Sequence, residues 1–157
     1  MPESRRGFDI LRAGVEHLEE VAALFDDYRV FYKRPPDAPC ATKFIGERLQ
    51  QNDSVIFLAR ARSEGVGALL GFTQLYPSFS SVSMKRLWIL NDLYVAAKGR
   101  RQGIARALIE RARQLAEETG AKGLILETAI DNVPARSLYD ACGFIKDTEF
   151  DRYALDV

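Results

Sequence analysis

Residues 86–129 read RLWILNDLYVAAKGRRQGIARALIERARQLAEETGAKGLILETA. A strand-like apolar run ends at Val95, and apolar residues then recur with helical spacing from Gly103 to Thr119. A second apolar run covers Gly123 to Ala129. A crossover helix of this length between two strands normally makes them parallel neighbours with a right-handed connection. The segment therefore predicts two parallel strands of one sheet, joined by a helix.

The rest of the chain predicts antiparallel strands and further helices, from alternating apolar residues, a hairpin turn and helical apolar spacing. Strands are expected over 8–12, 54–62, 67–76 and 86–95, and helices over 15–32, 41–51 and 132–141. A Ser-rich loop is expected over 77–83, and 144–157 leaves room for a closing hairpin. The predicted fold class is α/β (α+β mixed sheet): a central mixed, largely antiparallel sheet with helices on both faces, in a single domain over 1–157.

Composition narrows the functional classes. With 22 Lys+Arg against 22 Asp+Glu, the net charge is zero, which argues against a general nucleic-acid binder. An apolar fraction of 47% excludes a disordered chain. Two cysteines and one histidine are too few for a disulfide scaffold or a multi-histidine metal site, so no metal is expected. The N-terminal residues lack an apolar signal segment, and no apolar run approaches the ~20 residues of a membrane helix, so a cytoplasmic location is expected.

The turn Gly99–Ala105 joins a strand to the start of a helix. The first N–H groups of a helix have no partner within the helix and lie at the positive end of its dipole. Gly103 removes a side chain where an anion would approach, and Arg100, Arg101 and Arg106 add positive charge. This arrangement suits phosphate binding, although it lacks the Lys-Ser/Thr of a Walker loop and the third glycine of a dinucleotide-binding loop. A solvated basic helix start is the alternative.

A second motif covers residues 132–144, which read NVPARSLYDACGF. Asn132 is a good N-cap residue, and Gly143 ends the helix. Taken by itself, this pattern predicts no more than a short amphipathic helix with a core tyrosine.

Together, the two motifs resemble those of the GCN5-related N-acetyltransferases, the GNAT superfamily. The matching pattern is Arg100-x-x-Gly103-x-Ala105, followed by Asn132-x-x-Ala135-Arg136-x-Leu138-Tyr139-x-x-x-Gly143-Phe144. The resemblance covers essentially the whole chain, and residues 90–95 further resemble the histone and polyamine acetyltransferase branch. It implies the GNAT fold, in which the two parallel strands splay apart and acetyl-CoA lies in the wedge between them.

The resemblance also implies how acetyl-CoA is bound. Backbone groups of the strand that ends at Val95 would pair with the pantetheine arm and polarise the thioester carbonyl, and the amides of the turn would hold the pyrophosphate. The implied acetyl-CoA residues are Leu93, Tyr94, Val95, Arg100, Arg101, Gln102, Gly103, Ile104, Ala105, Arg106, Asn132 and Arg136.

The catalytic residues implied by the resemblance are Tyr139, Asp92 and Asn91. Tyr139 matches the family's usual general acid, which protonates the departing CoA thiolate. Many members carry a glutamate base where this chain has Asn91, whose amide has no useful basicity. Strand alternation directs the neighbouring Asp92 to the opposite face unless a bulge intervenes. A structural role is favoured for Asp92, and a rim charge for Glu127 on the partner strand, so a water relay or proton loss to solvent stays open.

The implied acceptor site combines aromatic and acidic side chains, which suit a cationic amine. The residues are Asp27, Tyr28, Phe31, Tyr32, Tyr76, Phe79 and Glu127, and core packing or solvation is the alternative for each one taken singly.

The expected activity is acetyl transfer from acetyl-CoA to a small cationic primary amine, by direct attack in a ternary complex. A protein lysine or N-terminus as acceptor, or an acyl-CoA sensor without turnover, is the alternative. The expected partners are acetyl-CoA and the amine, with no nucleic acid or membrane, and a homodimer stays open.

Overall fold

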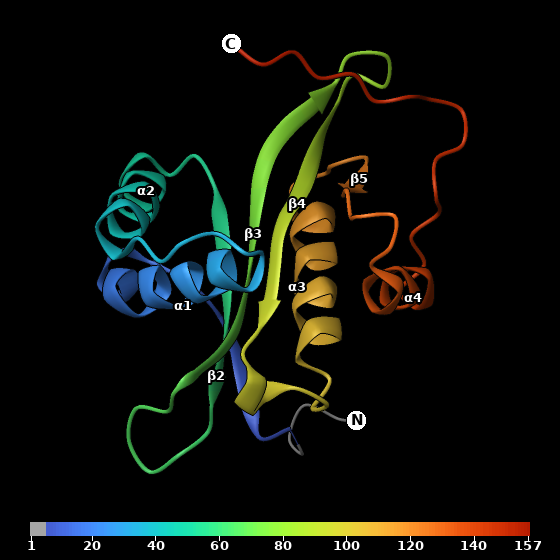
Figure 1. The fold of residues 1–157 in the computed structure, drawn as a ribbon. Helices are drawn as coiled ribbons and strands as arrows, with labels where there is room; N and C mark the ends of the chain where they lie inside the picture. The colour runs from blue at the N-terminus through green and yellow to red at the C-terminus, as the bar shows by residue number, and fades with distance from the viewer. Residues whose placement is uncertain (1–5) are drawn as a thin grey trace. The chain divides into compact units, whose positions relative to one another are not determined.

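The protein is described by a computed structural model, which covers residues 6–157 (Figure 1). The chain divides into two compact units, one ending at Glu127 and the other spanning Thr128–Val157. The expectation of a single domain over 1–157 stays a prediction. No helix within residues 6–157 is both long enough and apolar enough to cross a membrane.

The first unit is built on a five-stranded sheet with the strand order β1-β2-β3-β4-β5. Its strands are β1 (Phe8–Arg12), β2 (Val55–Ala61), β3 (Leu69–Ser80), β4 (Lys85–Val95) and β5 (Gly123–Ile125). Strands β1 to β4 pair antiparallel with their neighbours, whereas β4 and β5 pair parallel. The mixed sheet and its parallel pair confirm the predicted fold class.

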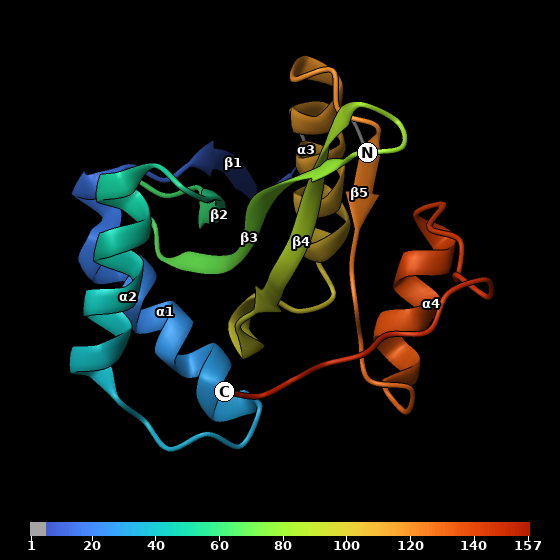
Figure 2. The same cartoon turned by 90° about the horizontal axis from the view of Figure 1, so that it is seen from above.

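Three helices cover the two faces of this sheet (Figure 2). They are α1 (Leu18–Phe31) and α2 (Ala38–Gln51) on one face, and α3 (Ile104–Glu118) on the other. On the α1/α2 face the main core cluster comprises Val21, Leu24, Ile45, Ile56, Leu58, Leu69 and Phe72. On the α3 face, Trp88 Nε1 donates a hydrogen bond of 2.9 Å to Thr119 Oγ1, which fastens β4 to the end of the helix. The predicted placement of helices on both faces is confirmed.

Two of the elements that begin or end away from their predicted positions involve proline. Helix α2 starts three residues early, because the Asp37 carboxylate caps the Cys40 N–H at 3.2 Å and Pro39 fits the first turn. Strand β3 continues through the expected loop to Ser80, although it contains Pro77. Its pairing with β2 ends at Leu75, so Pro77 lies where β3 is an edge strand and a missing N–H is tolerated.

The end of the chain also differs from expectation. Strand β5 covers only Gly123–Ile125 of the predicted 123–129. The second unit holds one helix, α4 (Val133–Ala141), and residues 144–157 contain no strand, so the expected closing hairpin is wrong for this structure. The apolar side chains of Tyr153 and Leu155 are exposed there. Alternating apolar residues predict a strand only where a partner strand covers one face.

Candidate active site

The turn before α3 leaves backbone donors open. The first intrahelical hydrogen bond runs from Ala107 N to Gly103 O at 3.0 Å, so the N–H groups of Ile104, Ala105 and Arg106 precede the helical ladder. Gly103 has a φ of 77°, and a Cβ added there would meet no atom within 4 Å. Three N–H groups at the positive end of a helix, next to a glycine with open space where a side chain would lie, fit an anionic pyrophosphate.

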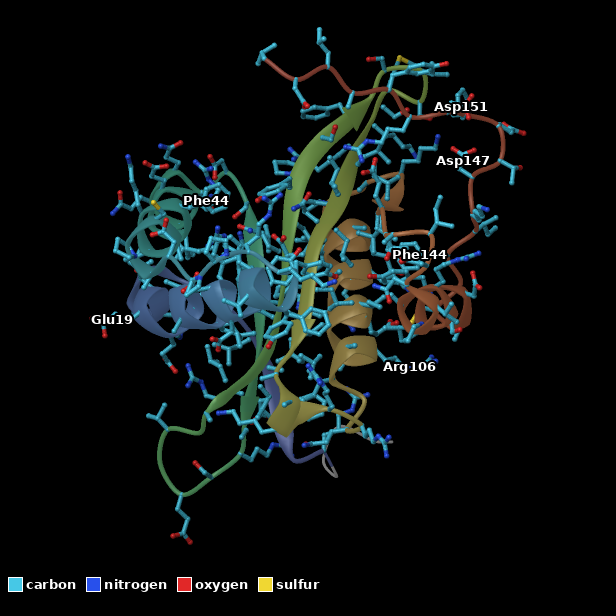
Figure 3. All side chains as sticks on the ribbon, viewed as in Figure 1. Glu19, Phe44, Arg106, Phe144, Asp147 and Asp151 are labelled. Carbon is cyan, nitrogen blue, oxygen red and sulfur yellow. The ribbon has the colours of Figure 1, made fainter. Side chains whose placement is uncertain are left out.

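The arginines of this turn do not all lie at the same place. Arg101 has a φ of 62°, and both Arg101 and Arg106 are exposed (Arg106 is labelled in Figure 3). Arg100 instead reaches back to the end of β4, where its Nε donates to Val95 O at 3.4 Å. Its guanidinium carbon lies 5.7 Å from the ring centroid of Phe31 on α1. Arg100 therefore connects the turn to the aromatic end of α1.

The two parallel strands, β4 and β5, pair along only the first half of β4. The β5 pairing stops at Ile89, which is opposite Ile125, whereas the β3 pairing continues to Val95. Within residues 6–157, the β5 side of β4 from Leu90 to Val95 therefore has no strand partner. The backbone of Leu93, Tyr94 and Val95 lies on this stretch, as the resemblance implies for a pantetheine-binding strand.

A β-bulge decides where the acidic side chain of β4 points. Gln74 pairs with Asp92 and Leu75 pairs with Leu90, so Asn91 is an extra residue in β4. Asn91 is exposed, and Leu90 and Asp92 are both buried although they lie on opposite faces of the sheet. Because cross-strand partners share a face, Asp92 lies on the α1/α2 face with Gln74. The bulge that the sequence left open is present, and it places the carboxylate beneath α1.

Asp92 is the centre of a buried polar network. Its side chain is only 4% exposed, and Gln74, which is fully buried, donates from Nε2 to Oδ2 at 2.8 Å. Asn91 Nδ2 donates to Oδ1 at 3.2 Å, and the Tyr28 hydroxyl of α1 also donates to the carboxylate. Ser54 Oγ, just before β2, in turn donates to Gln74 Oε1 at 3.0 Å. Burial raises the pKa of Asp92 above its ordinary value, and the three donors only partly oppose this shift.

Asp92→Asn should gain stability relative to the wild type as the pH rises. Because the pKa of Asp92 is raised above 3.8 on folding, the folded chain binds this proton more tightly than the unfolded chain. That stabilisation is complete below the unfolded pKa and is lost as the pH rises through the folded pKa, whereas asparagine does not titrate. Urea unfolding of both proteins between about pH 4 and pH 7 measures the difference. A difference in unfolding free energy that stays constant over this range would contradict the buried, titrating carboxyl.

The predicted acceptor aromatics converge on the same face. Tyr28 lies 5.0 Å from Tyr32 and 6.0 Å from Tyr94, measured between ring centroids, and Phe31 lies 5.9 Å from Tyr94. Phe31 and Tyr32 are each about half exposed, whereas Tyr28 is half-buried. We call Tyr28, Phe31, Tyr32 and Tyr94 the aromatic cluster. Tyr76 shares the face of Asp92, and its burial together with the charge of Asp92 raises the pKa of its phenol to about 12.

Three other predicted acceptor residues lie outside the aromatic cluster. Asp27 is exposed on α1, and Glu127 is exposed beyond the end of β5. Phe79 is 69% exposed near the tip of the β3–β4 hairpin, where its ring centroid lies 5.1 Å from the guanidinium carbon of Arg86. Their roles in acceptor binding stay predictions.

The second unit carries the remaining predicted residues. Tyr139, on α4, is half-buried, and its ring contacts Phe144 edge to face at 5.7 Å. The Asn132 side chain caps α4 by accepting from Ala135 N at 3.4 Å. Arg136 Nη1 donates to Ile130 O at 2.8 Å. The N-cap prediction for Asn132 is confirmed, and the catalytic role of Tyr139 stays a prediction.

Sequence reasoning missed the polar residues that surround Asp92. Gln74 and Ser54 are buried, and so is Thr73, whose Oγ1 donates to the backbone oxygen of Asp92 at 2.8 Å. The signal was present, since Thr73 and Gln74 interrupt an otherwise apolar run in β3. Buried polar side chains are normally hydrogen-bonded, so such an interruption points to partners in neighbouring strands.

Comparisons with known proteins bear on the family of the chain. The model of the acetyltransferase (GNAT) family matches residues 18–144. The uncharacterized N-acetyltransferase YhfO of Bacillus subtilis is 44% identical over 149 residues, which cover 95% of this chain and 97% of that protein. A crystal structure of a probable acetyltransferase has a TM-score of 0.88 at 45% identity, covering 95% of this chain and 97% of its own. A ribosomal-protein-alanine N-acetyltransferase from Brucella melitensis has a TM-score of 0.79 at 26% identity, covering 96% and 99%.

These findings do not separate the branches of the family, so the resemblance to histone and polyamine acetyltransferases stays a prediction. The match over residues 18–144 and the 44% identity over nearly the full lengths of both proteins are sufficient to assign the family. The chain belongs to the GNAT family of acetyltransferases.

Proposed function

We propose that this acetyltransferase moves the acetyl group of acetyl-CoA to a small cationic primary amine, by direct attack within a ternary complex. The observation that carries the proposal is that one compact unit holds two complementary features. One is the set of open N–H groups at the start of α3, and the other is the aromatic cluster above the carboxylate of Asp92. The first suits a polyanion and the second suits a cation.

Acetyl-CoA supplies the acetyl group as an activated thioester. The N–H groups of Ile104, Ala105 and Arg106 would hold its pyrophosphate, and the Arg101 side chain would add charge there. The side of β4 that β5 leaves without a strand partner, from Leu90 to Val95, would hold the pantetheine arm and offer hydrogen bonds to the thioester oxygen. Preorganised donors of this kind stabilise negative charge as it develops in acyl transfer.

On the acceptor side, the aromatic cluster would attract an ammonium group through cation–π contacts, with Asp92 supplying negative charge beneath it. The amine attacks only after it has lost a proton. The new C–N bond then forms as the C–S bond breaks, and the departing thiolate takes a proton from Tyr139, which the family pattern supplies. The second proton that the nitrogen loses as the amide forms restores the Tyr139 phenol, directly or through water. A tyrosine of pKa near 10 can protonate a thiolate of pKa ~8.5 if its surroundings assist the transfer.

Gly103→Ala should raise the KM for acetyl-CoA about tenfold. An L-residue in the left-handed region costs ~1–2 kcal/mol, and relieving that strain would turn the N–H groups away from the pyrophosphate. Gly120→Ala is the matched control, because Gly120 has a φ of 63° at the other end of α3 and a Cβ there also meets open space. Thermal unfolding should show similar losses of stability in the two variants, and initial rates should separate them. An equal KM for acetyl-CoA in both variants would contradict the assigned pyrophosphate site.

A protein N-terminus is the second candidate acceptor. The Brucella relative is named for a ribosomal-protein alanine, and the β3–β4 hairpin tip of this chain exposes Phe79, Val82 and Met84. Exposed apolar side chains of this kind suit contact with a peptide.

The acceptor class can be tested by measuring thiol release from acetyl-CoA with two matched panels. One panel contains small diamines and amino sugars, and the other contains peptides with different N-terminal residues. We expect kcat/KM to be at least about tenfold higher for the best small amine than for the best peptide, a difference of ~1.4 kcal/mol in transition-state binding. The reverse order would assign a protein acceptor. Acetyl-CoA binding without turnover across both panels would favour an acyl-CoA sensor.

A further inference from the structure

The side chains of Ser54, Gln74 and Asp92 form a buried chain of hydrogen bonds from the residue before β2, through β3, to β4. Ser54 is 8% exposed, Gln74 is fully buried and Asp92 is 4% exposed, and the two links measure 3.0 Å and 2.8 Å. A buried carboxylate accepts hydrogen bonds and cannot donate them, so Gln74 must present its NH₂ group to Asp92. Its carbonyl oxygen must then accept a hydrogen bond, and the Ser54 hydroxyl donates it. The negative charge of Asp92 therefore sets the direction of both hydrogen bonds.

Asp92 reaches the aromatic cluster only through another residue. Its carboxylate is buried, and its donor from the helical layer is the Tyr28 hydroxyl. Tyr28 is half-buried and its ring contacts Tyr32, which is half exposed. The Tyr28 side chain therefore contacts both the buried carboxylate, through its hydroxyl, and the half-exposed ring of Tyr32.

We propose that Gln74 and Ser54 are positioning residues that hold the Asp92 carboxylate so that it accepts the proton of the acceptor amine through the Tyr28 hydroxyl. The ammonium gives one proton to the Tyr28 oxygen as the Tyr28 proton passes to Asp92. The amine becomes neutral, Asp92 becomes protonated and Tyr28 is unchanged. This inference rests on the proposed function, because it supplies the base that acetyl transfer to an amine needs.

Several titratable or charged groups lie near Asp92, and the assignment of the acid limb of the pH profile depends on which of them changes its protonation state. Tyr28 faces it from α1 and Tyr76 from β3, and the pKa of Tyr76 is raised to about 12, so Tyr76 stays neutral. Arg48 of α2 and Asp53, which act on Tyr76, are paired with each other at 2.8 Å. Tyr94 lies on the same strand as Asp92. We therefore assign the acid limb of the pH profile of kcat/KM to Asp92.

The test compares the pH profiles of three variants of buried residues. Gln74→Met removes a donor to the ionised carboxylate, so the acid limb should move to higher pH by about one unit. Ser54→Ala should shift the limb in the same direction by a smaller amount. Thr73→Val is the matched control, because Thr73 is equally buried but donates to the backbone oxygen of Asp92. Its limb should not move.

Carbon-13 NMR titration of the Asp92 carboxyl gives a readout that does not depend on turnover. We expect the Asp92 carboxyl of Gln74→Met to titrate at higher pH than that of the wild type.

An acid limb that stays fixed in Gln74→Met, or one that moves equally in Thr73→Val, would overturn the positioning role. If Gln74→Met does not fold, a fixed limb in Ser54→Ala decides against it. A wild-type chain without amine-dependent CoA release overturns the proposed function and the relay together, whereas a normal profile with a fixed limb overturns only the relay.

Discussion

Tyr139→Phe should lower kcat by about a hundredfold and leave the dissociation constant of acetyl-CoA within about twofold of the wild type. The variant removes only the phenolic oxygen, so the edge-to-face contact with Phe144 and the fold of α4 are retained. What is lost is the proton that the CoA thiolate takes as the C–S bond breaks. Above about pH 8.5 the thiolate can leave without a proton, so the deficit in kcat should shrink there.

Tyr153→Phe is the matched control for this variant. Tyr153 lies in the same unit and is exposed, so the removal of its hydroxyl should change neither kcat nor binding. Steady-state kinetics over a range of pH and titration calorimetry with acetyl-CoA measure both quantities. A Tyr139→Phe enzyme with wild-type kcat at neutral pH would remove Tyr139 from the mechanism.

Asp92→Asn should lower kcat/KM for a fully protonated amine by about a hundredfold near pH 7. Asparagine keeps the shape of the side chain and can still accept from Gln74, but it cannot take a proton. The loss should disappear for an acceptor amine whose pKa lies below the assay pH, because that amine reaches the enzyme already neutral. This dependence on the basicity of the substrate separates the loss of a base from the loss of structure.

Glu117→Gln provides the control for removal of a carboxylate, because Glu117 is exposed on α3. We expect its kcat/KM to match the wild type with both kinds of amine. Equal losses in Asp92→Asn for neutral and protonated amines would show that Asp92 is structural, as the sequence alone favoured.

Much of the fold could be predicted from local patterns. The unit from β4 through α3 to β5 was accessible because an apolar run, a helix period and a second apolar run specify a parallel crossover. The absence of the hairpin expected over 144–157 could not be predicted, because the alternation of Tyr153 and Leu155 does not show whether a partner strand covers them. The Ser-rich segment 77–83 suggested a loop. The continuation of β3 through Pro77 depends on where the β2 pairing stops, which no local pattern reveals.

The donor side of the site could be predicted better than the acceptor side. Gly103 and the N–H groups after it form a local feature of a few consecutive residues, so the motif contains most of it. The face on which Asp92 lies depends on a bulge at Asn91. The sequence alone does not distinguish a bulged strand from a regular one at this position. Gln74 and Ser54 reach Asp92 only through the register of three strands, which no local spacing reveals.

Direct acetyl transfer to an amine is tested most directly by the products formed when the chain, acetyl-CoA and a small diamine react. Mass spectrometry and thiol titration can follow the N-acetylated amine and free CoA in the same sample. We predict that both appear in equal amounts and only when the amine is present, as direct attack in a ternary complex requires. Free CoA without an acetylated amine, or no release with any small amine while acetyl-CoA binds, would contradict it.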